Sequence, residues 1–215
     1  MAEQGRVIIL NGGSSAGKTT LGKTLQDLLL PEPYLLLGID AFWMALPPRQ
    51  LDLDQVEPGY YRWITTVENG LEYFRIIPGP ILDQAMRARY RAIAQFLDEG
   101  LNVIADDVIW KREWLLDALE ILAPYRVLMV GVFVSDAEGA RREVVRGDRH
   151  PGWDRGSARY AHHDAIYDLT IDTTTMTPEQ EAVRVKHALD SNPQGEAFGQ
   201  MRRKLLGPGN AGGVS

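Results

Sequence analysis

A glycine-rich segment near the start of the chain contains the residue types that bind phosphates. Gly12–Thr19, GGSSAGKT, fits the spacing G-x-x-x-x-G-K-[ST] and follows the apolar run Val7–Leu10. In such a loop, backbone N–H groups surround phosphate oxygens, the lysine reaches the β and γ phosphates, and the hydroxyl binds Mg²⁺. Motors, switches and kinases share this loop, so it does not specify the reaction. The predicted nucleotide-binding residues are Gly12, Gly13, Ser14, Ser15, Ala16, Gly17, Lys18, Thr19 and Thr20.

Acidic residues follow two apolar runs that we interpret as strands. Tyr34–Ile39 ends beside Asp40, and Leu101–Ala105 ends beside Asp106 and Asp107. Ligands of open α/β sheets bind at the carboxyl ends of the strands. Asp40 is therefore a candidate base for an acceptor hydroxyl, or alternatively the cap of a turn. Neighbouring strand residues face opposite sides, and we favour Asp106 over Asp107 for Mg²⁺, with a helix cap as the other interpretation of the pair.

An arginine-rich stretch, residues 141–161, has no steady period and is typical of a mobile lid. Helical spacing puts Arg142 and Arg146 on one face, and Arg149 follows. Guanidinium groups that close over the phosphates would spread the transition-state charge, and one could stack on adenine. A solvated charged face is the alternative.

An aromatic, proline-rich segment, Ala41–Gly79, interrupts the strand and helix alternation. Within it, RWITTVENGLEYFRI predicts a hairpin around Asn69-Gly70. The aromatic cluster forms either an acceptor pocket or the core of this insert. The paired His162 and His163 lack the spacing of a helical metal site, so we expect a surface or acceptor contact. The cluster comprises Phe42, Trp43, Met44, Tyr60, Tyr61, Trp63, Trp110 and Trp114.

Short apolar runs that alternate with amphipathic segments predict an α/β layered fold with a five-stranded parallel sheet. A helix from Thr177 begins with a capping-box signature. The expected strands are Val7–Leu10, Tyr34–Ile39, Leu101–Ala105, Arg126–Val134 and Leu169–Ile171, and the other expected helices are Lys18–Leu30, Pro80–Glu99, Lys111–Leu122 and Asp136–Arg146.

The composition narrows the class of protein. The chain has 215 residues, a formal net charge of -6 and no cysteine, which disfavours a dedicated nucleic-acid binder and excludes disulfides. The first residues lack a signal-peptide pattern and no run of about 18 apolar residues occurs, so we expect a cytoplasmic protein without a membrane partner. We predict one domain over residues 1–192 and a flexible tail over 193–215.

Five segments in the same order, ILNGGSSAGKT, LPEPYLLLGIDAF, VIADDV, RGDR and YDLTIDTT, resemble the chloramphenicol phosphotransferase family of P-loop kinases. The resemblance implies a three-layer P-loop kinase fold with strand order 2-3-1-4-5 and a hairpin inserted after the second strand. It also implies ATP and Mg²⁺, phosphorylation of an alcohol on a small molecule, Asp40 as the base, and lid arginines at Arg142, Arg146 and Arg149. The insert cannot be aligned residue by residue with that family, so the acceptor is not specified.

We therefore predict an ATP-dependent O-phosphotransferase, similar to chloramphenicol 3-O-phosphotransferase. Its predicted catalytic residues are Lys18, Asp40 and the three lid arginines, and its predicted metal ligands are Thr19 and Asp106. The alternatives are a kinase of another metabolite or a nucleotide, and a regulator that hydrolyses nucleotide slowly. The chain lacks an N-K-x-D guanine motif, which favours ATP over GTP. We expect a small hydroxylated acceptor, for which an aromatic molecule is one candidate, and a homo-oligomer is an open alternative.

Overall fold

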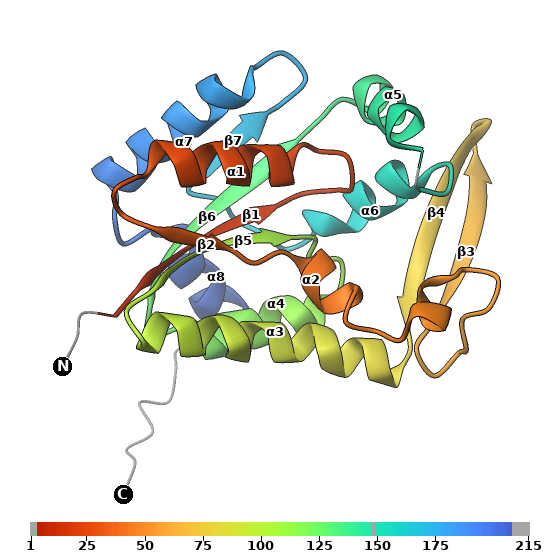
Figure 1. Ribbon diagram of the computed structural model, residues 1–215, viewed down its shortest axis with the longest axis horizontal. Coiled ribbons are helices and arrows are strands. Elements are labelled where there is room, and N and C mark those ends of the chain that lie inside the picture. The colour runs from red at the N-terminus through yellow and green to blue at the C-terminus, as the bar shows by residue number, and fades with distance from the viewer. Residues whose placement is uncertain (1–3, 148, 208–215) are drawn as a thin grey trace, which may run out of the picture.

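The computed structural model describes residues 4–147 and 149–207, and its centre is a five-stranded parallel sheet (Figure 1). The spatial order β2-β5-β1-β6-β7 is the order 2-3-1-4-5 along the chain, which confirms the predicted P-loop kinase architecture. Val7 to Leu10 are at most 1% exposed, because helices cover both faces of the sheet. The strands are β1 (Arg6–Asn11), β2 (Tyr34–Leu36), β5 (Asn102–Asp107), β6 (Arg126–Phe133) and β7 (Leu169–Asp172).

Two helical layers enclose the sheet. The helices α1 (Lys18–Leu28) and α7 (Pro178–Ser191) cover one face, and α3 (Pro80–Asp98), α4 (Arg112–Ile121) and α8 (Ala197–Leu206) cover the other (Figure 1). Side chains of β1 alternate between two apolar clusters: Ile8 and Leu10 pack toward α1 and α7, whereas Val7 and Ile9 pack toward α3 and α4. The predicted capping box of α7 is present at Thr177 and Gln180.

The insert after β2 contains the predicted hairpin. The strands β3 (Tyr61–Glu68) and β4 (Leu71–Pro78) are antiparallel, and Asn69 and Gly70 between them have φ angles of 52° and 77°. Two consecutive positive φ angles are typical of a two-residue turn whose twist matches the strands. The short helices α2 (Ile39–Trp43) and η1 (Pro48–Leu51) connect the sheet to this hairpin.

Two predictions from the sequence were wrong in detail. β2 ends at Leu36, and Asp40 lies in the first turn of α2, because the chain leaves the sheet before Gly38. The lid is largely regular: α5 (Asp136–Arg146) is followed by α6 (Trp153–Ala161).

The predicted flexible tail contains α8, which buries Ala197, Phe198 and Met201 in the cluster under α3 and α4. Residues 208–215 of that tail lie outside the described residues. Within the part of the chain that the structure describes, no helix is both long and apolar enough to cross a bilayer.

Candidate active site

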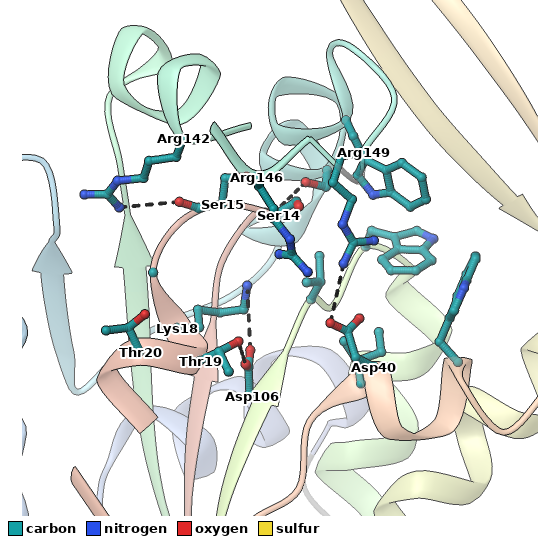
Figure 2. Close-up of a pocket in the computed structure, with 17 residues that line it drawn as sticks. Ser14, Ser15, Lys18, Thr19, Thr20, Asp40, Asp106, Arg142, Arg146 and Arg149 are labelled. Carbon is teal, nitrogen blue, oxygen red and sulfur yellow. Dashed lines mark hydrogen bonds and ion pairs between the residues drawn. The ribbon is translucent and has the colours of Figure 1, made fainter. Parts of the chain in front are cut away.

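The glycine-rich loop joins β1 to α1 and brings the predicted donor residues together (Figure 2). The Lys18 ammonium donates a hydrogen bond of 2.7 Å to the carbonyl of Gly13 and lies 3.8 Å from Oδ1 of Asp106. The Thr19 hydroxyl donates to Oδ2 of Asp106 at 2.5 Å. The lysine, the hydroxyl and one acidic residue of β5 thus form a single polar cluster at the carboxyl edge of the sheet.

The loop has the conformation and the free polar groups that phosphate oxygens require. Gly17 has a φ angle of 89°, and a Cβ on Gly12 would lie 2.3 Å from the carbonyl oxygen of Val132, so both positions need glycine. No side chain caps the N-terminus of α1, and its first turn contains no acidic residue. The Ser15 hydroxyl is buried without a hydrogen-bond partner among the described residues. This arrangement fits a nucleotide phosphate.

Asp106 and Asp107 face opposite sides of β5, as predicted. Asp106 points toward the loop, and burial raises its pKa above the ordinary value even though Lys18 opposes the shift. Asp107 is buried on the other side, where Arg89 donates to both its oxygens at 2.8 and 3.1 Å and the Tyr90 hydroxyl donates at 2.7 Å. Only Asp106 is therefore placed beside Thr19, and carboxylate and hydroxyl oxygens suit Mg²⁺.

Arg142 lies on the β7 side of the loop, apart from Asp40 (Figure 2). Its guanidinium donates to the hydroxyl and the carbonyl of Thr173 at 2.8 and 2.7 Å, and to Glu138 at 2.8 Å. A longer bond of 3.4 Å reaches the carbonyl of Ser15. Arg142 thus connects α5, the end of β7 and the loop, whereas Arg146 and Arg149 lie nearer the centre of the site.

Asp40 meets the lid through Arg149. Their side chains form an ion pair at 3.5 Å, and the guanidinium of Arg149 lies 4.9 Å from the ring centre of Trp153. The side chain of Asp40 is 60% exposed, whereas that of Arg149 is 17% exposed. The acidic residue is accessible from the cavity, and the cation that contacts it is partly enclosed by the lid.

One cavity of about 240 Å³ joins these groups. Asp40, Asp106 and the three lid arginines line it together with Ser14, Ser15 and Gly17 to Thr20, whereas Gly12, Gly13 and Ala16 do not. The opposite wall is apolar and aromatic and consists of Ile39, Trp43, Val108, Trp110 and Trp153. A polar wall that carries the glycine-rich loop therefore faces an apolar wall across a space of small-molecule size.

The predicted aromatic cluster divides between the cavity and the core. Trp43 and Trp110 line the cavity, whereas Tyr61 and Trp114 are fully buried and Met44 is 65% exposed. Of the two histidines, neither lines the cavity: His163 is exposed, and the ring centre of His162 lies 4.0 Å from that of Phe133. Burial lowers the pKa of His162 to about 4.

Several residues of the site were not identified from the sequence. Trp153 and Ser157 of α6 line the cavity, and the Ser157 hydroxyl accepts a 2.7 Å hydrogen bond from the backbone N–H of Ser14. Glu143 of α5 accepts hydrogen bonds of 2.9 Å from the N–H groups of Gly152 and Asp154, which joins the two lid helices. No local motif indicates these contacts, because each joins residues from separate elements or a helix and a loop.

Solved structures of small-molecule kinases share the fold at low sequence identity. APS kinase CysC of Mycobacterium tuberculosis, solved in complex with AMPPNP and APS, superposes with a TM-score of 0.60 at 14% identity, covering 87% of this chain and 98% of that one. Shikimate kinase of Acinetobacter baumannii, solved with shikimate, gives a TM-score of 0.54 at 17% identity, covering 88% and 96%.

Sequence comparisons identify closer relatives. Two Mycobacterium tuberculosis proteins, from strains H37Rv and CDC 1551, carry the name "Putative O-phosphotransferase", and each is 58% identical over 205 residues, which is 94% of this chain and 90% of the relative. The family described as "Chloramphenicol phosphotransferase-like protein" matches residues 5–190. With its P-loop, its acidic β5 edge and its arginine-bearing lid, the chain belongs to the chloramphenicol phosphotransferase-like family.

Proposed function

We propose that this protein transfers the γ-phosphoryl group of ATP to the hydroxyl of a small molecule. The family and the P-loop kinase fold support a phosphotransferase. The observation that carries the finer proposal is the position of Asp40: its carboxylate shares one cavity with Lys18 and Thr19 and contacts Arg149 of the lid. A carboxylate in that position suits proton removal from an acceptor hydroxyl.

In the proposed step, the acceptor oxygen forms a bond to the γ-phosphorus as its proton passes to Asp40. The bond between that phosphorus and the oxygen bridging to the β-phosphate breaks, and ADP leaves. Asp40 also orients the hydroxyl, because its exposed carboxylate is held at 3.5 Å from Arg149. Positioning and charge stabilisation then supply most of the acceleration, as is general for phosphoryl transfer.

The donor side would hold the nucleotide through groups that are already close together. Lys18 can exchange its 2.7 Å bond to the Gly13 carbonyl for a phosphate oxygen, and the uncapped N-terminus of α1 offers further N–H groups. Thr19 and Asp106 are the residues that would hold Mg²⁺, which neutralises phosphate charge when bound. Arg146 and Arg149 would cover the phosphates from the lid.

The aromatic wall supports a flat, largely apolar acceptor that carries a hydroxyl. Trp43, Trp110 and Trp153 offer ring surface, and of the three arginines of the same cavity Arg149 lies against the ring of Trp153. Chloramphenicol is one member of that class, and the family description makes it the first compound to test. An acceptor that is itself phosphorylated is disfavoured, because the aromatic wall presents no cluster of cations.

The test is acceptor-dependent ADP release across a panel of hydroxylated aromatic compounds, with Lys18→Ala as the blank. With a compound that reacts, Asp40→Asn should lower kcat by about 10²-fold or more and leave ATP affinity within about twofold. Asp190→Asn on α7 is the matched control, since that carboxylate is similarly exposed but lies outside the cavity. Unchanged turnover in Asp40→Asn would exclude its role as base. An ADP release rate that is the same with and without each compound would favour the alternative of a regulator that hydrolyses nucleotide slowly.

A further inference from the structure

A narrow slot opens beside the aromatic wall of the main cavity. Trp110, Trp153 and Ser157 line both spaces. Arg75 of β4 and Tyr160 of α6 line the slot but not the main cavity. Its volume is about 20 Å³, and about 10 to 15 Å³ is enough for one water molecule. The slot therefore has room for one or two oxygen atoms at the end of a ligand that occupies the main cavity.

Two residues that line this slot carry buried hydrogen-bond donors without partners. The indole Nε1 of Trp110 and Nε of Arg75 are both buried, and neither has a partner among the described residues. An N–H group can only donate, and leaving one buried and unpaired destabilises the protein. Two such donors in one slot call for an oxygen that accepts hydrogen bonds.

A second arginine between the β3–β4 hairpin and α6, Arg159, provides a comparison for Arg75, because it has a carboxylate partner. Arg75 lies 4.2 Å from the ring centre of Tyr160, and Arg159 lies 4.1 Å from that of Tyr73. Arg159 also donates two hydrogen bonds of 2.7 Å to the carboxylate of Glu68. Within the described part of the chain, Arg75 has no carboxylate partner. The two arginines stack alike, and only the one that lines the slot lacks a negative charge beside it.

We propose that this slot binds a carboxylate of the acceptor, so that the substrates are aromatic hydroxy acids. This inference rests on the proposed function, because it assigns the acceptor of the same cavity. A guanidinium pairs strongly with a carboxylate, and the Trp110 N–H supplies a second donor. The hydroxyl then lies toward Asp40 and the ring lies between the indoles of the main cavity. A single water would satisfy the donors but would leave the charge of Arg75 without a counter-charge.

Binding of two matched probes tests the slot without requiring any reaction. We would titrate 4-(hydroxymethyl)benzoate and its methyl ester into the full chain and measure dissociation constants by NMR. The wild type should bind the acid about tenfold more tightly than the ester. Arg75→Gln should abolish this preference, and Trp110→Phe, which keeps an aromatic ring but removes the indole N–H, should reduce it. Arg159→Gln should retain it, since that arginine lies outside the slot.

Equal binding of acid and ester by the wild type, or an acid preference that persists in Arg75→Gln, would overturn the inference. An acid preference lost in Lys18→Ala but kept in Arg75→Gln would also overturn it, because the carboxylate would then be bound by the phosphate loop. Should Arg75→Gln not fold, Trp110→Phe decides the same question. Acid-selective binding without ATP-dependent phosphorylation would support the slot while contradicting the proposed function, so the two failures are distinguishable.

Discussion

The phosphate-binding wall and the aromatic wall of the cavity are built in different ways. The first is mostly one continuous segment, Ser14 to Thr20, in which the Lys18 ammonium and the Thr19 hydroxyl both contact Asp106. The second comes from α2, the segment after β5 and α6, and β4 joins these elements only in the neighbouring slot, whose lining residues carry buried N–H donors without partners. A local motif thus organises the first wall, which we call the donor wall because we propose that it holds the phosphate donor. Tertiary packing assembles the aromatic wall, which we call the acceptor wall because we propose that it holds the acceptor.

The lid is the part of the molecule that contacts both walls. Its first helix, α5, holds Arg142 against the loop and Thr173, and α6 contributes Trp153 to the aromatic wall. Glu143 joins the two helices through the N–H groups of Gly152 and Asp154. If the walls are functionally separate, substitutions in one should change the use of one substrate, and substitutions between the two lid helices should change stability.

Removing the lysine of the donor wall should have the largest effect. Lys18→Ala should lower kcat by about 10²- to 10³-fold with every acceptor, because the charge beside the transferring phosphate is lost. Binding of an acceptor, measured by NMR without nucleotide, should change by less than about twofold, since the aromatic wall does not contain Lys18. Lys23→Ala, on the exposed side of the same helix, is the control. A large loss of acceptor binding in Lys18→Ala would show that the walls are not independent.

The corresponding substitution on the acceptor side is Gly156→Ala in α6, which should disrupt the packing of α6 against the hairpin. A Cβ on Gly156 would lie 1.7 Å from the carbonyl oxygen of Phe74, so α6 must move away from β4, at a cost of about 1–3 kcal/mol. We expect KM for the acceptor to rise about tenfold and KM for ATP to stay nearly constant. Urea unfolding and two-substrate kinetics measure both effects.

The matched control for this substitution is Gly199→Ala in α8. There the nearest atom to the new Cβ belongs to the flexible side chain of Arg203, at 3.5 Å. That variant should be neutral or up to about 1 kcal/mol more stable, because alanine favours helices. Equal stability of Gly156→Ala and the wild type would show that the contact between α6 and the hairpin is not tight.

Asp154→Asn tests the joint between the lid helices. Burial and the nearby carboxylate of Glu143 raise the pKa of Asp154 to about 7, with Asp136 acting in the same direction and Arg155 opposing it. The unfolded chain loses this proton near pH 4, so the wild type loses stability as pH rises from about 4 to 7. Asparagine cannot ionise, and the variant should therefore gain about 1–2 kcal/mol relative to the wild type at pH 8 and almost nothing at pH 4. Unfolding at several pH values, with Asp190→Asn as the control for an exposed carboxylate, measures the difference. A constant difference across this range would contradict the assignment.

The sequence indicated which residues of the proposed donor wall lie together, because its signals are local. The loop motif, the apolar strand before it and the alternation of Asp106 and Asp107 each depend on neighbouring residues. Asp40 was placed at the correct edge of the sheet but in the wrong element. The apolar run from Tyr34 reads through Ile39 as a strand, whereas β2 ends at Leu36 and Asp40 enters a short helix.

The acceptor wall was less predictable because its helices depend on distant contacts. α6 is only nine residues long and buries Asp154 and Gly156, and it is held by Glu143 and by the hydrogen bond from the N–H of Phe74 to the carbonyl of Gly152. Outside the acceptor wall, α8 was also missed. It has an apolar helical period, since Phe198 and Met201 are three residues apart and both buried, but the glycine-rich residues after it favoured a flexible tail. Trp153 could be assigned to the cavity only after α6 was placed.

The smallest expected effect concerns the helix end that serves the donor wall. α5 begins with Ser135 as cap and α7 with Thr177, and both have acidic residues in the first turn, whereas α1 has neither. An acid at the start of α1 should therefore stabilise the ligand-free protein, and Thr20→Asp should add about 0.3–1 kcal/mol. The same negative charge should weaken ATP binding several-fold, because it faces the phosphates.

Thr24→Asp, one turn further along, should have a smaller effect on both quantities because the helix-end field fades within a turn. Unfolding and calorimetric titration with ATP would be measured on both variants. If Thr20→Asp bound ATP as tightly as the wild type, the end of α1 would not be the phosphate site. If it bound less tightly while the free protein became more stable, the missing cap would be a feature kept for the ligand at the expense of stability.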